Sequence, residues 1–188
     1  MSLLGAVLAG GRSSRMGMDK ASIEISGVSL LTRVVAAVGE VTNRVVVLGG
    51  DREGIESWPD LAPMPGPLAG VATALSRMTE SRALVVAVDN AFVQPGTLRR
   101  LASIESDLPV VPVDEAGVRQ VTCAIYPKQI AGPAMDEAEA GGSVQTLLDR
   151  VSFLPVTPEQ WSVWGEDGRS WYSVDTPEAL EAGLRRFG

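Results

Sequence analysis

Four short runs of apolar residues along the chain predict β-strands. They cover residues 5–9, 44–48, 83–88 and 108–113, and β-branched residues make up much of each run. Because the apolar residues follow one another almost without polar interruption, we expect these strands to be buried on both faces of a parallel sheet. A fifth run, VTCAIY at 121–126, also predicts a strand, and in it we interpret Cys123 as a packing residue.

Between the strands, apolar residues recur with the spacing of helices. The first two series are Leu30, Leu31, Val34, Val35, Val38 and Leu68, Val71, Ala72, Leu75, Met78, and a shorter one is Leu98, Leu101, Ala102, begun by Pro95. Alternating strands and helices predict an α/β fold, with helices on both faces of a mostly parallel central sheet. At 188 residues, we expect one domain spanning 1–188.

The last third of the chain gives two further expectations. Residues 175–187, DTPEALEAGLRRF, predict a helix with Asp175 or Thr176 as N-cap, Pro177 in the first turn and basic residues in the last turn. Residues 137–168 are the least regular stretch, with two glycines at 141–142, and we interpret them as a flap or an interface. Trp161, Trp164 and Trp171 either close a small C-terminal layer or stack on a ligand ring.

Composition narrows the possible chemistry. The net charge is −7, which disfavours nucleic-acid binding, and a single cysteine excludes an internal disulfide. The chain has no histidine, so general-base and zinc sites built on histidine are excluded. Carboxylates, Lys, Arg, backbone amides and a hard cation remain. No apolar run approaches the ~18 residues of a membrane span, and no signal peptide is recognisable, so we expect a cytoplasmic protein without membrane contact.

Polar or glycine residues follow each of the first four predicted strands. They are GGRSSR, GGDRE, DN and DE in chain order. Ligands of open α/β sheets bind beyond the carboxyl ends of the strands. We therefore expect these four strand ends to converge on one site.

The loop after the first strand has the composition of a phosphate site. Gly10 and Gly11 allow close backbone approach and an anion-binding turn. Ser13 and Ser14 add hydroxyl groups, and Arg12, Arg15 and Lys20 add positive charge. The spacing matches neither a Walker A loop nor the dinucleotide fingerprint. A surface turn with solvated charges is the alternative interpretation.

A third pattern fits this loop. LAGGRSSRMGMDKA, residues 8–21, resembles the signature L-A-G-G-x-S-x-R-M-G-x-D-K of a nucleotidyltransferase family, and more narrowly of the molybdenum cofactor guanylyltransferases. GPLAG at 66–70 resembles the second family motif, with Asp60 upstream. ALVVAVD, ending at Asp89, resembles the strand that ends in a metal-binding aspartate, and VDTPEAL at 174–180 resembles the closing motif N-T-P-E-x-L.

This resemblance implies transfer of GMP from GTP to the phosphate of molybdopterin with release of pyrophosphate, using Mg²⁺. It implies catalytic roles for Arg15, Lys20 and Asp89, with Asp89 as the metal ligand, and an acceptor side near Arg15 and Asp175. It also implies protein partners that deliver or receive the cofactor. The implied nucleotide-binding residues are Leu8, Ala9, Gly10, Gly11, Lys20, Asp60, Pro67, Leu68 and Asp89.

The chain departs from the family pattern in two places. It has Asp89-Asn90-Ala91-Phe92 where the family has D-x-P-F, and Asp175 where asparagine is usual. Transfer to another phosphorylated acceptor, such as a sugar 1-phosphate, and a nucleotide-binding assembly protein without catalysis therefore remain alternatives. For Asp60, Asp89 and Asp175, a role in a turn or helix cap is the alternative. Among the enzymes that the chain resembles, L-A-G-G accompanies guanine and L-A-A-G accompanies cytosine, so Gly10 implies guanine as the base. We expect an alanine methyl there to intrude on a purine.

Overall fold

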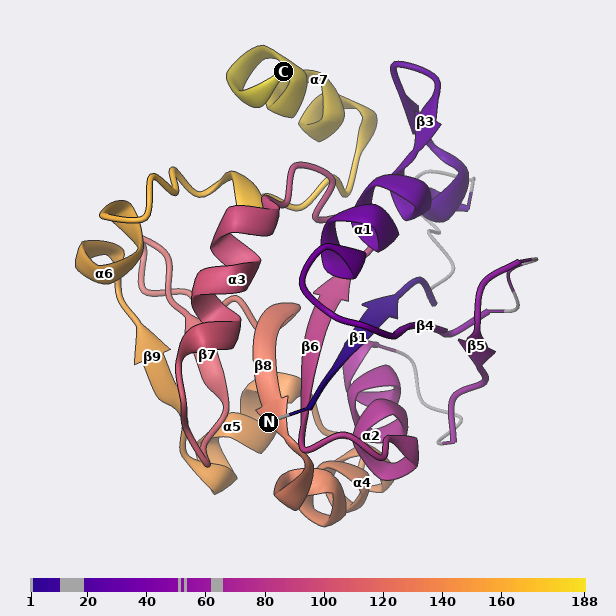
Figure 1. The fold of residues 1–188 in the computed structure, drawn as a ribbon, viewed down its shortest axis with the longest axis vertical. Helices are drawn as coiled ribbons and strands as arrows, with labels where there is room; N and C mark the ends of the chain where they lie inside the picture. The colour runs from indigo at the N-terminus through magenta and orange to yellow at the C-terminus, as the bar shows by residue number, and fades with distance from the viewer. Residues whose placement is uncertain (1, 11–18, 51, 53, 62–65) are drawn as a thin grey trace.

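The computed structural model describes residues 2–10, 19–50, 52, 54–61 and 66–188. Among these residues, seven strands form one sheet in the order β5-β4-β1-β6-β8-β7-β9 (Figure 1). The strands are β1 (Leu3–Leu8), β4 (Val45–Leu48), β5 (Ser57–Trp58), β6 (Arg82–Ala87), β7 (Val110–Pro112), β8 (Cys123–Pro127) and β9 (Leu154–Val156). A small antiparallel hairpin, β2 (Glu24–Ile25) and β3 (Val28–Ser29), stands apart. The α/β prediction is confirmed.

Strand direction differs from the prediction on one side of the sheet. β1, β4, β5 and β6 are mutually parallel, as expected. β8 lies between β6 and β7 and is antiparallel to both, whereas β9 is parallel to β7. The carboxyl end of β7 is therefore one strand further from β6 than a purely parallel sheet would place it.

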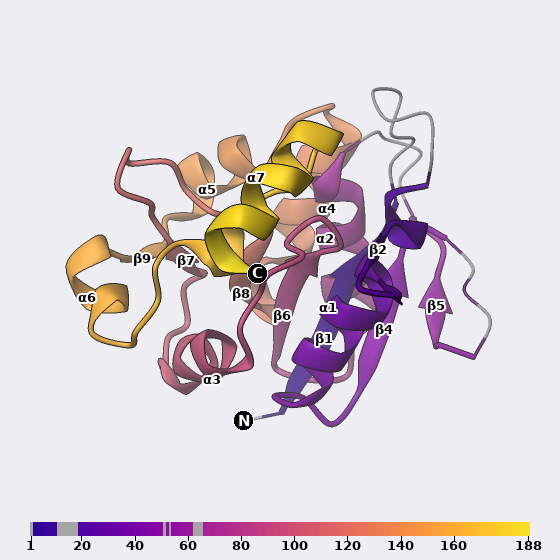
Figure 2. The ribbon, with the colours of Figure 1, turned by 90° about the horizontal axis from the view of Figure 1, so that it is seen from above.

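Helices cover both faces of the sheet (Figure 2). One face carries α1 (Leu30–Gly39) and α3 (Pro95–Ser103), and the other carries α2 (Pro67–Arg77), α4 (Ala131–Glu139) and α5 (Val144–Val151). Successive residues of a strand point to opposite faces. In β6, Leu84 and Val86 accordingly join one core cluster, and Ala83 and Val85 join the other. Burial of both faces explains why the strands read as nearly continuous apolar runs.

The stretch 137–168 is regular, contrary to the expectation of a flap. It contains α5, β9 and α6 (Pro158–Ser162). Ser143 caps α5 by accepting a hydrogen bond from the Thr146 amide at 3.1 Å, and the Thr146 hydroxyl accepts from the Ser143 amide at 2.8 Å. Gln160 accepts from the amide of Thr157 at 2.9 Å at the start of α6. These reciprocal caps fix the ends of two short helices.

The tryptophans close the C-terminal layer. Trp161 and Trp171 are 4% and 6% exposed, and their rings pack edge to face with centroids 5.2 Å apart. The Trp161 indole Nε1 donates to the carbonyl of Val113 at 2.9 Å, and Trp164 is partly buried against the same core. The side chains of Trp161 and Trp171 both belong to one of the two core clusters. The packing interpretation is therefore confirmed, and so is that of Cys123, which is fully buried.

Helix α7 (Pro177–Phe187) lies beyond the end toward which β6 points (Figure 1). Thr176 is its N-cap, because the Thr176 hydroxyl accepts from the amide of Ala179 at 3.1 Å, so Asp175 does not cap the helix. A Cβ on Gly183 would lie 2.4 Å from the Phe92 ring, so glycine is required for this close approach. Residues 89–92, which depart from the family pattern D-x-P-F, therefore contact α7 through the buried side chain of Phe92.

None of the helices in the described parts of the chain has the length and apolar character needed to cross a membrane.

Candidate active site

The carboxyl ends of β1 and β6 open on a cavity of about 310 Å³. Seven of the residues predicted to form the site line it together. They are Leu8, Ala9, Gly10, Lys20, Pro67, Asp89 and Asp175. Gly66, Ala87, Val88, Thr122 and Ser173 also line it and were not predicted. Thr122 reaches this edge because it directly precedes β8, whose antiparallel direction the residue pattern did not indicate.

Lys20 lies at the centre of the charged part of this cavity. It begins a short 3-10 helix, Lys20–Ser22, which Asp19 caps by accepting from the Ala21 amide at 3.1 Å. Its ammonium Nζ contacts Asp89 Oδ2 at 3.1 Å and Asp175 Oδ1 at 2.5 Å. Burial lowers the pKa of Lys20, but the hydrogen bond to Asp175 and the charge of Asp89 outweigh it, so the pKa is raised. The ammonium is therefore charged at neutral pH.

Backbone contacts hold Asp89 and Asp175 side by side. Asp89 follows β6 at a turn closed by the Asn90 amide, which donates to the carbonyl of Ala87 at 3.0 Å. The amide of Val174 donates to the carbonyl of Asp89 at 2.9 Å. Two carboxylates separated by 86 positions in the chain thus meet at one ammonium because the segment before α7 is hydrogen-bonded to the end of β6.

The N-terminus of α2 faces the same cavity. Gly66 precedes it with φ of 107° and no side-chain cap, and Pro67 occupies the first turn. The free amides of a helix N-terminus and its partial positive charge favour a negatively charged ligand. Leu68 was predicted as a nucleotide contact, but its side chain is 3% exposed and belongs to the core, and the described lining of the cavity does not include it.

Gly10 packs against the loop that follows β4. A Cβ at Gly10 would lie 2.7 Å from the Cα of Gly49, and one at Gly49, where φ is +87°, would lie 2.3 Å from the Cα of Gly10. The sequence analysis attributed the need for glycine to room for a purine. The structure corrects this reason, because an alanine methyl would meet the Gly49 backbone first.

Replacing Gly10 with alanine is therefore expected to destabilise the protein itself. Overpacking of this kind costs about 1–3 kcal/mol of unfolding free energy, which for a chain of this size lowers Tm by several degrees. Thermal unfolding without ligand measures it. Gly96→Ala is the matched control, because nothing lies within 4 Å of a Cβ there. A melting temperature of Gly10→Ala equal to that of the unmodified protein would contradict the close approach.

Asp60 lies outside the Lys20 cavity. It lines a neighbouring cavity of about 600 Å³ together with Gly49, Gly50, Ser57 and Pro59. Burial raises the pKa of the Asp60 carboxyl above its ordinary value. Asp60 as a residue is exposed, so the shift reflects partial desolvation of its carboxyl at the edge of the cavity, a setting found at functional sites.

We expect Asp60→Asn to stabilise the protein at neutral pH. Because the pKa of Asp60 is higher in the folded than in the unfolded chain, its ionisation lowers the unfolding free energy as pH rises above the unfolded value of about 3.9. The advantage of the variant should appear at pH 7 and vanish near pH 4 or below. Denaturant unfolding across this range measures it, with exposed Asp107→Asn as the control. An advantage independent of pH would contradict partial desolvation of the Asp60 carboxylate as the cause.

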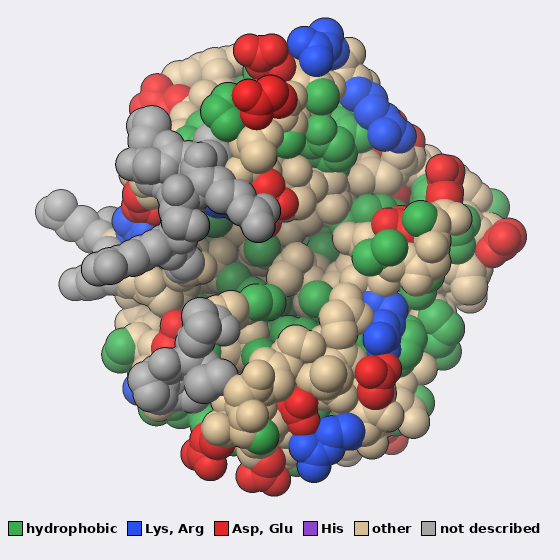
Figure 3. Space-filling view, turned by 180° about the vertical axis from the view of Figure 1, so that it is seen from behind, with side chains coloured by type: hydrophobic (Ala, Val, Ile, Leu, Met, Phe, Trp, Pro, Cys, Tyr) green, Lys and Arg blue, Asp and Glu red, His purple; other side chains and the backbone are tan. Residues whose placement is uncertain are grey.

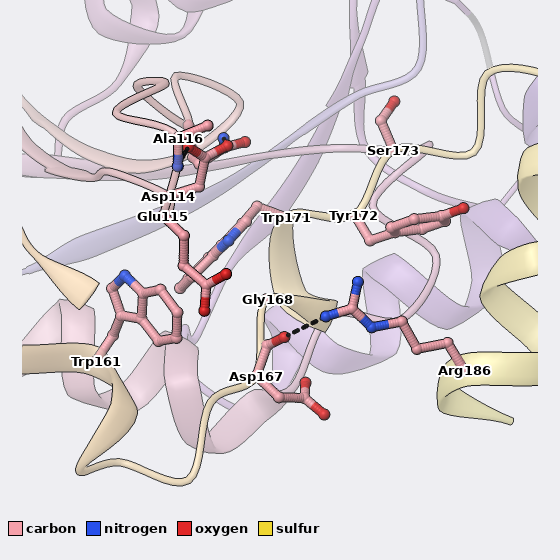
Figure 4. A pocket seen from close by; sticks show the side chains of 11 residues that line it. Asp114, Glu115, Ala116, Trp161, Asp167, Gly168, Trp171, Tyr172, Ser173 and Arg186 are labelled. Carbon is pink, nitrogen blue, oxygen red and sulfur yellow. Dashed lines mark hydrogen bonds between the residues drawn. The ribbon is translucent and has the colours of Figure 1, made fainter. Parts of the chain in front are cut away.

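The end of β7 lines a separate cavity, contrary to the expectation that four strand ends converge on one site. Asp114 and Glu115 face Trp161, Trp171 and Arg186 across about 330 Å³ (Figure 4). Arg186 donates to the carbonyl of Asp167 at 3.2 Å there. Ser173 lines both this cavity and that of Lys20, so the two adjoin. The antiparallel β8 between β6 and β7 is the physical cause of the separation.

Part of the predicted phosphate loop lies outside the described residues. This holds for Gly11, Arg12, Ser13, Ser14 and Arg15. The described side of the loop is anchored by an ion pair, in which Arg52 Nη1 lies 2.8 Å from Asp19 Oδ2.

Charged side chains are dispersed over the face seen from behind. Among the coloured side chains in Figure 3, Lys and Arg stand singly or in small groups between acidic residues. The described part of this face therefore presents none of the broad basic patches typical of nucleic-acid binding.

Comparisons with known proteins agree with this geometry. A family model described as MobA-like NTP transferase domain matches residues 5–154. A probable molybdenum cofactor guanylyltransferase of Pelotomaculum thermopropionicum is 34% identical, and the match covers 94% of this chain and 89% of that protein. The crystal structure of molybdopterin-guanine dinucleotide biosynthesis protein A from Archaeoglobus fulgidus superposes with a TM-score of 0.84 over 97% of each chain, at 22% identity. A Mycobacterium tuberculosis protein crystallised with manganese superposes with a TM-score of 0.69 over 98% of each chain, at 17% identity. The chain therefore belongs to the MobA-like NTP transferase family, as the motif after its first strand indicated.

Proposed function

We propose that the protein transfers GMP from GTP to the phosphate of molybdopterin and releases pyrophosphate, a step of molybdenum cofactor biosynthesis. The observation that carries the proposal is the meeting of Lys20, Asp89 and the N-terminus of α2 in one cavity, at the ends of the strands that follow the family motifs. The relative from Pelotomaculum thermopropionicum has the corresponding name.

The reaction suits a site without histidine. An acceptor phosphate oxygen forms a bond to the α-phosphorus of GTP, and the bond from that phosphorus to the bridging oxygen of the β-phosphate breaks. Pyrophosphate leaves with the electron pair. Because the acceptor phosphate is largely ionised at neutral pH, no general base is needed, and catalysis consists of positioning and charge neutralisation.

We assign charge neutralisation to Lys20, together with Arg15 from the loop that precedes it. Lys20 is 18% exposed in its side chain and its ammonium lies in the cavity, so it can exchange a carboxylate for a phosphate without leaving the site. The N-terminus of α2 borders the same space at Gly66 and Pro67 and adds partial positive charge.

We assign the divalent cation to the Asp89 side of the cavity. Carboxylate oxygens are hard ligands that suit Mg²⁺, which binds through one or two carboxylates and substrate phosphates. Bound there, Mg²⁺ would polarise the phosphates and offset their negative charge. The Mycobacterium tuberculosis protein of the same fold was crystallised with manganese.

We place the nucleoside of GTP along Leu8, Ala9, Gly10 and Pro67, with Asp60 on the far side of Gly49 as a further nucleotide contact. The acceptor enters from the side of Ser173 and Asp175, where the second cavity adjoins the first. Protein partners in cofactor delivery remain an expectation.

Pyrophosphate release tests the proposal. With Mg²⁺ present, release is expected only when GTP and molybdopterin are supplied together. Release with a sugar 1-phosphate but not with molybdopterin would reject molybdopterin in favour of another acceptor. Nucleotide binding without release under any of these conditions would indicate an assembly protein without catalysis.

A further inference from the structure

Thr122 lines the Lys20 cavity although it belongs to none of the motifs found in the sequence. It directly precedes β8, which is antiparallel to β6, so the start of β8 lies at the edge of the sheet where β6 ends. The register pairs Cys123 with Val86, and Thr122 follows this pair toward the cavity. The antiparallel strand therefore brings a threonine to the same edge as Asp89.

The backbone around Thr122 is held in place by hydrogen bonds. The amide of Ala87 donates to the carbonyl of Thr122 at 2.8 Å. The hydroxyl of Tyr126, a fully buried residue, donates to the carbonyl of Val121 at 2.6 Å. Thr122 is thus fixed by the sheet before any ligand binds, which is the arrangement that precise recognition of a ligand requires.

The fold does not use the side chain of Thr122. Its hydroxyl forms no hydrogen bond with the residues that the structure describes, and the residue is partly exposed. The hydroxyls of Thr146 and Thr176, by contrast, accept from backbone amides at the starts of helices. A hydroxyl group can donate one hydrogen bond and accept two, so that of Thr122 is available to a ligand in the cavity.

The strand order identifies the part of the substrates that lies next to Thr122. From β4 across the sheet, the order is β1, β6, β8 and β7. Gly10 follows β1 on the proposed nucleoside side, Asp89 follows β6 at the proposed cation, and Glu115 follows β7 in the adjoining cavity. Thr122 at β8 therefore lies beyond Asp89, on the side away from the nucleoside. This is the side from which the acceptor enters in the proposed function.

We propose that the Thr122 hydroxyl binds the phosphate of the acceptor by donating a hydrogen bond to one of its oxygens. The ligand class is a phosphate monoester, a group that molybdopterin and a sugar 1-phosphate share. Lys20 already supplies a cation in this cavity. A neutral hydroxyl can orient the phosphate while leaving negative charge on the oxygen that attacks the α-phosphorus. This inference rests on the proposed function, which supplies the nucleotide and the acceptor.

Acceptor kinetics of Thr122→Val test the proposal, because valine keeps the branched shape and lacks the hydroxyl. Pyrophosphate release is measured with the acceptor varied at saturating GTP, and with GTP varied at saturating acceptor. We expect kcat/KM for the acceptor to fall by about 10- to 100-fold, the effect of losing one hydrogen bond to a charged group. KM for GTP should stay unchanged. Thr122→Ser keeps the hydroxyl and should recover most of the loss.

Thr79→Val is the matched control for loss of a threonine hydroxyl. Thr79 lies beyond the end of α2 that is far from the cavity, and its exposed hydroxyl donates to Glu80 at 3.3 Å. Thermal unfolding checks that each variant is folded. The proposal would be overturned by an unchanged kcat/KM for the acceptor in Thr122→Val, by an equal loss for GTP, or by an equal loss in Thr122→Ser.

Equilibrium dialysis separates failure of this proposal from failure of the proposed function. Molybdopterin and a sugar 1-phosphate are each dialysed against protein, Mg²⁺ and a GTP analogue with a methylene group between the α- and β-phosphorus, so that no transfer occurs. If only the sugar 1-phosphate binds and Thr122→Val weakens its binding about 10-fold or more, molybdopterin is rejected and the role of Thr122 stands. Equal affinity of Thr122→Val and the unmodified protein for the acceptor that binds, or binding of neither acceptor, would overturn the role of Thr122.

Discussion

Lys20→Ala is expected to lower kcat for guanylyl transfer by about 10²- to 10³-fold, the usual effect of removing one group that stabilises charge in the transition state. Lys20 is the described cation of the cavity, and negative charge shifts toward the β-phosphate as pyrophosphate leaves. Its ion pairs with Asp89 and Asp175 show that the ammonium already reaches the charged centre of the site.

Steady-state pyrophosphate release measures this loss, and thermal unfolding checks that the variant is folded. Lys20→Arg keeps the charge and should retain more activity than Lys20→Ala. Arg99→Ala is the control for net charge, because Arg99 is exposed on α3 and pairs with the exposed Glu40. Near-normal turnover of Lys20→Ala would remove Lys20 from the mechanism.

Asp89→Asn is expected to lower Mg²⁺-dependent turnover by at least about 100-fold, because a metal ion contributes several kcal/mol of charge stabilisation and each 1.36 kcal/mol is tenfold in rate. Asparagine has the same size as aspartate but lacks its charge. The backbone carbonyl of residue 89, which accepts from the Val174 amide, is unaffected by the change. The fold and weak metal-free nucleotide binding should therefore persist.

Calorimetric titration with GTP, with Mg²⁺ and then with a chelator, separates metal binding from nucleotide binding. The unmodified protein should lose affinity when Mg²⁺ is removed, and Asp89→Asn should not. Asp149→Asn is the control, because Asp149 lies in a surface ion pair with Arg119. A variant that kept both its activity and its Mg²⁺ requirement would show that Asp89 does not hold the cation.

The strands with continuous apolar runs and the helices with a regular apolar spacing were predictable from the sequence. The strand at 83–88 and the helix begun by Pro95 lie within a residue or two of β6 and α3. The direction of β8 was not predictable, because a strand buried on both faces has the same residue pattern in parallel and antiparallel pairing. Because β8 lies between β6 and β7, Asp114 after β7 lines a different cavity from Asp89 after β6.

Short helices at 137–168 were missed although the sequence carried a signal for them. Ser143 and Thr146, and likewise Thr157 and Gln160, have the three-residue spacing of reciprocal caps. The region was instead expected to be an irregular flap because of its paired glycines at 141–142 and its tryptophans. Buried Trp161 and Trp171 instead hold this region against the sheet.

The sequence predicted which residues form the candidate site better than how these residues are arranged. The motifs named Lys20, Asp89 and Asp175, but local patterns cannot reveal that residues 155 positions apart, such as Lys20 and Asp175, form an ion pair. Asp175 and Thr176 are both good capping residues, and only the backbone path shows that Thr176 caps α7. The prediction of Leu68 as a nucleotide contact could have been avoided, because its place in the helical apolar pattern already predicted that its side chain is buried.

Competition between GTP and CTP in one reaction tests the central claim most directly. The unmodified protein, Mg²⁺ and molybdopterin are incubated with equal concentrations of both nucleotides, and the dinucleotide products are identified by mass. A site built on specific hydrogen bonds rejects a wrong base because buried polar groups would lose their partners. The account predicts a guanine product favoured by at least ~10-fold in kcat/KM, or about 1.4 kcal/mol, and equal use of CTP would contradict it.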